Sequence, residues 1–211
     1  KYIKMFKFKI IDNFLDKENF EKLKLLELES VPVNFTKVYH NEIDKNDKIL
    51  KLSLDENLIR SIHKNHHNKI FKILEELDYE KSKLYEYSDI SLIKCGKGYK
   101  FPIHDDTPNK LLSCVIYIYP NNNCGTILYE NKKGHGKKII EWKQNRNLIF
   151  SRIERKTWHS FESDGVSDRV ALVYNLMTTQ IKKVYKIEKK SYLIGKFRWK
   201  INPYLYNYFK F

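Results

Sequence analysis

The sequence predicts a mainly β protein, a sandwich or barrel of strands flanked by α-helices. From residue 87 to 177, short runs of β-branched and aromatic residues alternate with turn-forming segments such as Gly96-Lys97-Gly98. Eight runs at this spacing are typical of an all-β sandwich or barrel. The predicted strands are residues 90–95, 99–104, 111–119, 126–130, 137–142, 148–151, 157–161 and 170–177.

Two helices are expected ahead of these strands. Residues 16–28 place Phe20, Leu23 and Leu26 on one face, and Asp16 is suited to cap the first turn. Residues 55–77 carry an apolar stripe at spacings of three and four. The stripe consists of Ile59, Ile62, His66, Ile70, Ile73 and Leu77. We expect both helices to pack on one outer face. Before them, residues 5–11 alternate lysine with apolar residues and predict a half-buried strand.

The chain of 211 residues suits one domain with one core. We expect residues 1–86 to support the core, residues 87–178 to form it, and residues 181–211 to form a C-terminal extension. That extension holds nine lysine or arginine residues, nine aromatic residues and one acid, Glu188. It is interpreted either as a lid or surface for an anionic partner, or as a packing extension or dimer contact; its structure and the oligomeric state are not assigned.

Composition narrows the class of protein. Three cysteines without a CxxC spacing argue against a disulfide framework or a thiolate zinc site, and favour a reducing cytoplasm. No apolar run is long enough to cross a bilayer, and the start of the chain does not resemble a signal peptide. The net charge of +14 indicates either attraction to nucleic acid or an anionic surface, or only the lysine-rich usage of an AT-rich genome.

A candidate metal site lies at the end of the second predicted core strand. His104 and Asp106 are two residues apart, so in an extended segment both side chains point the same way, whereas Asp105 points away. His159, within another predicted strand, is the leading third ligand. Two histidines and one carboxylate leave adjacent coordination positions open, as in the facial triad of non-haem iron(II) sites. Each piece alone also occurs by chance, and a single histidine in a strand is commonly structural.

The other histidines are weaker candidates. His63 and His67 are four residues apart on the predicted helix, which suits a metal pair, but the sequence offers no evident third ligand. We therefore interpret them, with His66, as surface or core residues. His40 and His135 are expected to face solvent.

Arg169 strengthens the interpretation of the triad. It follows His159 by ten residues, across a turn at Ser163-Asp164-Gly165-Val166, and begins a strongly strand-like segment. An arginine there would point into the core, where an unpaired charge is costly unless a carboxylate ligand neutralises it. The alternative is a surface arginine paired with Asp168 or Glu162.

These residues, in this order, resemble the 2-oxoglutarate/Fe(II)-dependent oxygenase superfamily, and in particular its prolyl-4-hydroxylase-like branch. The resemblance covers residues 98–175, through the segments GYKFPIHDD, CVIYIYPNNNCGTILYE, NRNLIFSRIERKTWHSF and DRVALVYNL. Three departures stand out. Cys124-Gly125 replaces a Gly-Gly pair, Ala171 stands where several members have Ser or Thr, and the second arginine of the nucleic-acid demethylases is missing.

The resemblance implies a double-stranded β-helix, or cupin-like jelly roll, and a hydroxylase that uses O2. It implies iron(II) ligands at His104, Asp106 and His159, and it implies that Arg169 binds the distal carboxylate of 2-oxoglutarate. Tyr117, or alternatively Tyr119, would help to hold that carboxylate, and Tyr99 would line the pocket. Ascorbate is a further candidate cofactor.

The primary substrate stays open at the level of sequence. A prolyl or other side chain and a small metabolite are both compatible with the motif. The net positive charge favours a nucleic-acid oxygenase, but the sequence motif does not. A non-catalytic, cupin-like metal-binding module is the third alternative, although such a module would not need Arg169.

Overall fold

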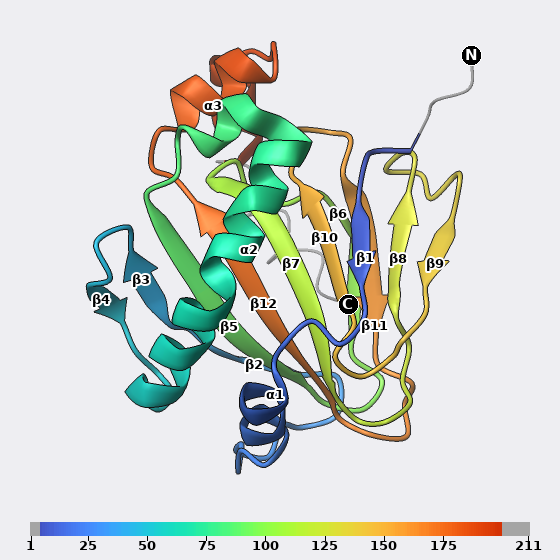
Figure 1. The fold of residues 1–211 in the computed structure, drawn as a ribbon. Helices are drawn as coiled ribbons and strands as arrows, with labels where there is room; N and C mark the ends of the chain where they lie inside the picture. The colour runs from blue at the N-terminus through green and yellow to red at the C-terminus, as the bar shows by residue number, and fades with distance from the viewer. Residues whose placement is uncertain (1–4, 200–211) are drawn as a thin grey trace.

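The computed structural model describes residues 5–199, which fold into two facing β-sheets with helices on one side (Figure 1). The larger sheet has the strand order β1-β10-β7-β12-β5-β3-β4, with β2 also paired to β5, and the smaller sheet has the order β6-β11-β8-β9. All recorded pairings are antiparallel. The strands are β1 (Lys9–Ile11), β2 (Thr36–Tyr39), β3 (Glu42–Asp44), β4 (Ile49–Lys51), β5 (Tyr87–Cys95), β6 (Lys100–His104), β7 (Lys110–Tyr119), β8 (Thr126–Tyr129), β9 (Lys138–Ile140), β10 (Asn147–Ser151), β11 (Trp158–Glu162) and β12 (Arg169–Met177).

The eight strands from β5 to β12 form a double-stranded β-helix, which confirms the predicted jelly roll. The chain crosses repeatedly between the sheets, so that β5, β7, β10 and β12 lie in the larger sheet and β6, β8, β9 and β11 in the smaller one. Because side chains alternate along a strand, each core strand presents one face to the space between the sheets. On β12, Arg169 and Ala171 face that space, whereas Val170 and Leu172 join the core on the other face.

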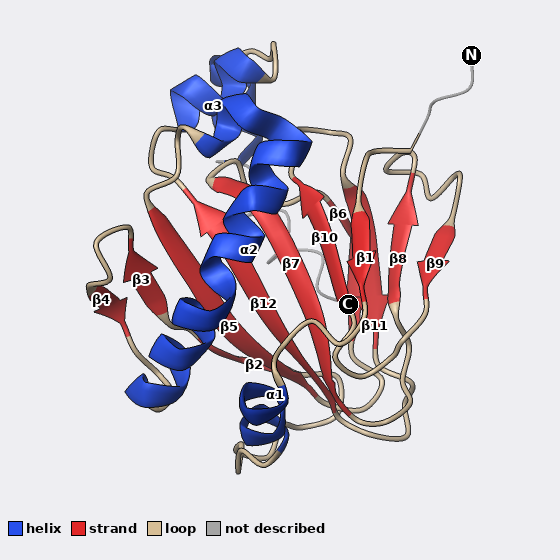
Figure 2. Cartoon of the chain, viewed as in Figure 1, coloured by secondary structure: helices blue, strands red, loops and turns tan. Residues whose placement is uncertain are grey.

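The first two helices cover the outer face of the larger sheet, and the third packs against the second beyond the ends of the strands (Figure 2). They are α1 (Lys17–Lys24), α2 (Glu56–Ser82) and α3 (Ile181–Ile187). Asp16 caps α1 through the Asn19 backbone NH, as predicted, and Asp55 caps α2 in the same way. The predicted stripe of α2 is buried at Ile59, Ile62, His66, Ile70 and Ile73. Its burial against β7 and β10 removes apolar surface from water and fixes the helix on the sheet.

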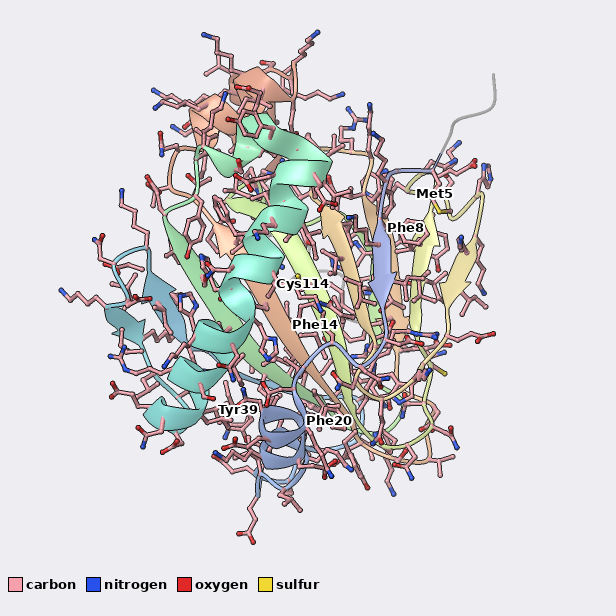
Figure 3. All side chains as sticks on the ribbon, viewed as in Figure 1. Met5, Phe8, Phe14, Phe20, Tyr39 and Cys114 are labelled. Atoms are coloured by element: carbon pink, nitrogen blue, oxygen red, sulfur yellow. The ribbon has the colours of Figure 1, made fainter. Side chains whose placement is uncertain are left out.

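Two apolar clusters hold the layers together. The larger one joins α1 and α2 to the sheet, and includes Phe14, Phe20 and the buried thiol of Cys114 on β7 (Figure 3). The smaller one lies between the sheets and contains Leu128, Ile140, Leu148 and Phe150, with Met5, Phe6 and Phe8 packed against it. Cys95 and Cys114 are buried free thiols, and Cys124 is a partly exposed one.

The structure differs from the predictions mainly before residue 56. The strand predicted at residues 5–11 is paired only over Lys9–Ile11, and the first helix ends at Lys24. The second helix is kinked at Asp78, which is not helical, directly after its predicted end, and a further helical turn reaches Ser82. Strands β2, β3 and β4 were not predicted, because runs of three or four residues carry too little periodicity to be recognised. No helix within residues 5–199 is long and apolar enough to cross a membrane. The cytoplasmic location stays a prediction.

Candidate metal centre

Neighbouring strands of the smaller sheet bring the three predicted ligands together. His104 is the last residue of β6, and it lies directly opposite His159 on β11 in the antiparallel register. Asp106 follows two residues later and points to the same side. Donor atoms of His104, Asp106 and His159 all lie within 4.8 Å of one another, which is the spacing that a single metal ion requires. The spacing of two residues in the sequence and the strand register therefore define one site.

Backbone carbonyls orient both imidazoles. Nδ1 of His104 lies 2.9 Å from the carbonyl oxygen of Pro102, and Nδ1 of His159 lies 2.9 Å from that of Thr157. A carbonyl only accepts hydrogen bonds, so each Nδ1 carries the proton and each Nε2 keeps its lone pair. Metal-binding histidines are commonly fixed in this way.

Two side-chain hydrogen bonds orient the carboxylate of Asp106. Ser113 Oγ donates to Oδ2 at 2.6 Å, and Lys110 Nζ donates to Oδ1 at 2.8 Å. Burial alone would raise the pKa of Asp106, but the charges of Lys110 and the two histidines lower it well below its usual range. Burial, together with the charge of His159, lowers the pKa of His104 to about 3. His104 thus offers a neutral imidazole and Asp106 an ionised carboxylate, and together with His159 they form a donor set that fits iron(II).

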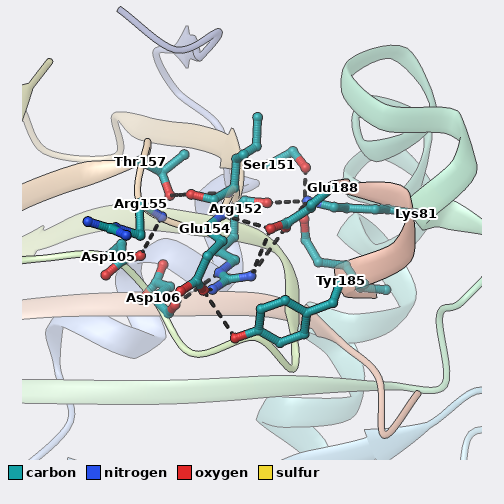
Figure 4. A network of polar contacts seen from close by, with 12 residues as sticks. Lys81, Asp105, Asp106, Ser151, Arg152, Glu154, Arg155, Thr157, Tyr185 and Glu188 are labelled. Atoms are coloured by element: carbon teal, nitrogen blue, oxygen red, sulfur yellow. Dashed lines mark hydrogen bonds and ion pairs between the residues drawn. The ribbon is translucent and has the colours of Figure 1, made fainter. Parts of the chain in front are cut away.

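A buried network of charges lies next to the candidate ligand Asp106 (Figure 4). Arg152, fully buried, donates from Nε to the carbonyl oxygen of Asp106 at 3.0 Å. Its other nitrogens contact Glu154 and Glu188, and Glu188 also accepts from Lys81 Nζ at 2.7 Å. Because each of these charges has an opposite partner, the network can be buried without leaving a lone ion. It connects the backbone of the site to α2 and to the turn that follows α3.

The segment beyond α3 also reaches the site. Residues 192–199 are helical, and Arg198 pairs with the carboxylates of Asp105 and Glu154. Asp105, predicted to point away from the metal, is buried and also accepts from the Arg155 backbone NH at 2.8 Å. Arg198 and Asp105 are 93 residues apart in the sequence. The C-terminal extension, whose structure the sequence did not predict, therefore forms one wall of the site through residues 197–199.

A cavity of about 940 Å³ lies between the sheets and contains the triad. Its lining is mostly apolar and aromatic, and includes Tyr99, Phe101, Trp158, Phe161, Phe197 and Trp199. Strand β2, which the sequence did not reveal, adds Thr36 and Val38 to one wall. A volume of this size accommodates a metabolite-sized ligand, and the apolar walls exclude bulk water from it.

Arg169 lines the same cavity, and its guanidinium has no acidic partner among the described residues. The residue is 1% exposed, and its Nε and Nη2 atoms are buried without a hydrogen-bond partner. The rings of Phe161, Trp142 and Tyr117 lie 4.6, 5.0 and 5.6 Å from its Cζ. Burial lowers the pKa of Arg169. A buried cation with free donors matches a ligand carboxylate, which can accept both bonds and neutralise the charge.

The alternative interpretation of Arg169 as a surface residue is wrong, because its two proposed partners are paired elsewhere. Asp168 lies 3.4 Å from Lys94 Nζ, and Glu162 lies 3.6 Å from Lys100 Nζ. The thiol of Cys95, opposite Arg169 on β5, hydrogen-bonds the guanidinium but cannot neutralise it.

The three predicted tyrosines lie in different environments. Tyr117 is fully buried beside Arg169; its hydroxyl donates to Thr126 Oγ1 and accepts from the Thr126 backbone NH, both at 2.9 Å. Neither Tyr117 nor Tyr119 lines the cavity directly. Tyr119 is 46% exposed, whereas the buried ring of Tyr117 lies against the Arg169 guanidinium, so the geometry favours Tyr117 of the two. Tyr99 lines the cavity.

Sequence reasoning missed several residues of the site. Ser113 could have been found, because it shares the inward face of β7 with Tyr117 by the period of two. Lys110 and Arg198 carried no local signal, since lysine and arginine are frequent throughout the chain.

No protein-family model and no curated protein matches this chain by sequence. Solved structures do match it. A prolyl-4-hydroxylase from Pseudomonas putida has a TM-score of 0.54 at 12% identity, over 81% of this chain and 92% of that one. A 2OG-Fe(II) oxygenase family oxidoreductase from Burkholderia pseudomallei has a TM-score of 0.57 at 12% identity, over 81% and 84%.

A prolyl hydroxylase from Trichoplax adhaerens, in complex with a hypoxia inducible factor oxygen degradation domain peptide fragment, has a TM-score of 0.54. It is 17% identical, over 84% of this chain and 86% of that one. The chain thus has the fold of 2-oxoglutarate/Fe(II) oxygenases and is similar in structure to prolyl hydroxylases. At these identities the likeness concerns the fold, and function must be argued from the site.

Proposed function

We propose that this protein is a 2-oxoglutarate- and O2-dependent hydroxylase that uses non-haem iron(II). The observation that carries the proposal is the unpaired guanidinium of Arg169 in the same cavity as the triad of His104, Asp106 and His159. A plain metal-binding module of the cupin type would gain nothing from this buried charge, which costs free energy until an anion binds.

Bound iron(II) would supply the open coordination positions and the electron transfer that dioxygen activation requires. The residues of the chain perform the remaining tasks. His104, Asp106 and His159 would hold the ion on one side only. Arg169 would bind the distal carboxylate of 2-oxoglutarate and so orient its 2-oxoacid end toward the metal.

Tyr117 and Thr126 would shape the end of the cavity that receives 2-oxoglutarate. Their mutual hydrogen bonds fix the Tyr117 ring, which also stacks on Trp142 at a centroid distance of 4.5 Å. The fixed rings leave little room for water around the guanidinium. Exclusion of water strengthens the charge interaction with a carboxylate and protects reactive species from side reactions.

The primary substrate would enter beside the triad, where aromatic side chains and the described part of the C-terminal helix form the walls. The Trichoplax neighbour binds a peptide, and a prolyl or other side chain is therefore one candidate. A small metabolite also suits a cavity of about 940 Å³. The net charge of +14 is the observation that favours a nucleic-acid substrate instead. Ascorbate dependence and a cytoplasmic location stay predictions.

Conversion of 2-oxoglutarate to succinate, measured with added iron(II) in the presence and absence of O2, tests this proposal. We expect slow O2-dependent turnover by the wild type, and none by His104→Ala or Asp106→Ala. Arg169→Ala should mainly raise the 2-oxoglutarate concentration needed for half-maximal rate. His135→Ala, which alters an exposed histidine, is the matched control. Succinate formation by the triad variants at the wild-type rate would exclude the assigned site.

A mass-shift screen for the addition of one oxygen atom, across peptides, metabolites and nucleic acids, would then identify the substrate class. Salt-dependent binding of DNA or RNA, followed by oxygen transfer to it, would support the nucleic-acid alternative.

A further inference from the structure

A second cluster of histidines lies on the opposite face of the larger sheet, beneath α2. His63 and His67 line a separate cavity of about 600 Å³ between this helix and the turn that joins β3 to β4. Residues four apart on a helix share one face, so the two imidazoles stack at a centroid distance of 4.5 Å. The sequence offered no third ligand for this pair, but the fold places Asp47 of the turn beside it.

One buried hydroxyl orients both rings. Nδ1 of His63 and Nδ1 of His67 lie 2.6 and 3.3 Å from the hydroxyl oxygen of Tyr174, which itself donates to Ser88 Oγ at 3.3 Å. With the Tyr174 proton directed to Ser88 Oγ, both Nδ1 atoms are donors to the hydroxyl oxygen. The Nε2 atoms then carry lone pairs, and they point away from Tyr174. A carboxylate, carbonyl or hydroxyl that fixes Nδ1 in this way is the usual support of a metal-binding histidine.

The pKa values of both histidines favour the neutral form. Burial lowers the pKa of His63, and burial with the charge of His63 lowers the pKa of His67 to about 4. At neutral pH both Nε2 lone pairs are therefore available to a metal ion.

The separation of His63 and Asp47 suits an intervening ion better than a direct hydrogen bond. His63 Nε2 lies 3.4 Å from Asp47 Oδ1. Direct N–H···O bonds have lengths of about 2.7–3.2 Å. Two ligands of a tetrahedral centre with bonds of about 2.0–2.1 Å lie about 3.4 Å apart. Two lone pairs that face each other also repel, unless a positive charge lies between them.

Hydrogen bonds fix the turn that carries Asp47. Asp44 Oδ1 accepts hydrogen bonds from the backbone NH groups of Asn46 and Lys48 at 2.8 and 2.9 Å. Asp47 itself has a positive φ of 61°, which aspartate tolerates in such turns. Arg60, one turn before His63 on α2, donates to the Asp47 carbonyl at 2.9 Å and fastens the turn to the helix.

We propose that His63 Nε2, His67 Nε2 and the Asp47 carboxylate form a second metal site, for a divalent transition metal of the zinc class. Two imidazoles and one carboxylate favour such ions over Mg²⁺ or Ca²⁺, and the fourth position faces the cavity. Lys45 and Lys64 on the cavity wall favour an anion as the fourth ligand. The site is independent of the oxygenase proposal, because it lies on the other face of the sheet.

Closure of the site needs one movement. Within residues 5–199, only the triad of His104, Asp106 and His159 has three donor atoms within 4.8 Å of one another. The carboxylate of Asp47 must therefore turn toward His67. Its side chain is 80% exposed, so a change of rotamer meets little resistance.

Cobalt(II) titration of the metal-free full-length chain under nitrogen tests the proposal, with bound metal counted by elemental analysis. We expect two ions per chain for the wild type and one for His104→Ala, in which only the second site remains. Adding Asp47→Asn to His104→Ala should weaken the remaining site at least tenfold, and adding His67→Ala should abolish it. Zinc should compete with cobalt at this site, whereas magnesium should not.

Asp47→Asn is the decisive variant, because its exposed side chain makes misfolding an insufficient explanation. His135→Ala in the His104→Ala background is the matched control and should leave one ion bound. A wild type that binds a single ion, which His104→Ala removes, would show that only the triad holds metal and would overturn the proposal. A second ion that Asp47→Asn and His67→Ala leave unchanged would overturn it equally. A single ion that the wild type and His104→Ala bind equally would show that the triad holds no metal, and would count against the oxygenase proposal instead.

Discussion

Replacement of Arg169 by methionine separates two effects of its buried charge: the effect on the free energy of unfolding without ligand, and the effect on binding of 2-oxoglutarate. Methionine keeps the length and the contacts with the aromatic rings but removes the charge. The two unsatisfied donors, Nε and Nη2, each cost about 1–3 kcal/mol in the ligand-free protein. The three rings return about 0.5–2 kcal/mol each through cation–π attraction. These contributions nearly cancel, so we expect Arg169→Met to leave ligand-free stability unchanged or raised, within about 2 kcal/mol.

The same variant should lose its response to 2-oxoglutarate. A ligand at 100 times its dissociation constant stabilises the fold by about 2.7 kcal/mol. For a chain of this size, 1 kcal/mol shifts the melting temperature by about 2–4 °C, so the wild type should gain about 5–11 °C. Thermal unfolding with iron(II) under nitrogen, with and without 2-oxoglutarate, measures both effects.

Arg155→Met, which changes an exposed arginine, should keep the response to 2-oxoglutarate and serves as the control. Two results would refute the reasoning. The first is a loss of more than about 3 kcal/mol in ligand-free Arg169→Met, since that loss is typical of a broken, paired charge. The second is an undiminished shift of its melting temperature by 2-oxoglutarate.

Three further predictions concern stability. Arg198→Gln leaves Asp105 buried without its cation, so the free energy of unfolding, measured by urea denaturation, should fall by about 2–4 kcal/mol. The second change Asp105→Asn should restore part of that loss, and strictly additive losses from the two changes would contradict the pairing. Gly125→Ala would place a Cβ atom 1.8 Å from the Ile140 carbonyl oxygen, so we expect a loss of about 1–3 kcal/mol, and unchanged stability would show that β8 and β9 can separate. For Asp16, burial alone would raise the pKa, but hydrogen bonds led by the Asn19 backbone NH lower it to about 2, below the usual 3.8. Its ionised form thus stabilises the fold above about pH 4, and this contribution disappears as the pH falls toward 2. Asp16→Asn should therefore cost about 1 kcal/mol at pH 7, a value reduced for partial exposure, and clearly less at pH 2; an equal cost at both values would contradict the assignment.

Patterns within single segments were sufficient to predict the jelly-roll strands and the first two helices, and to propose the triad. His104 and Asp106 could be paired because alternation along a strand is a local property. Arg169 could be singled out because its own strand pattern placed it in the core. The short strands β2, β3 and β4 were missed, and with them one wall of the cavity and the turn that carries Asp47.

Residue type and neighbours within ten positions were enough to select candidate ligands for iron and for a carboxylate. The contact of Arg198 with Asp105 across 93 residues, and the position of Asp47 beside His63, follow from the folded chain alone. Such contacts depend on how helices and short strands pack against the sheets, and no local periodicity encodes that packing. Within residues 5–199 the fold gives Arg169 no acidic partner, whereas it places Asp47 beside the helical pair of His63 and His67.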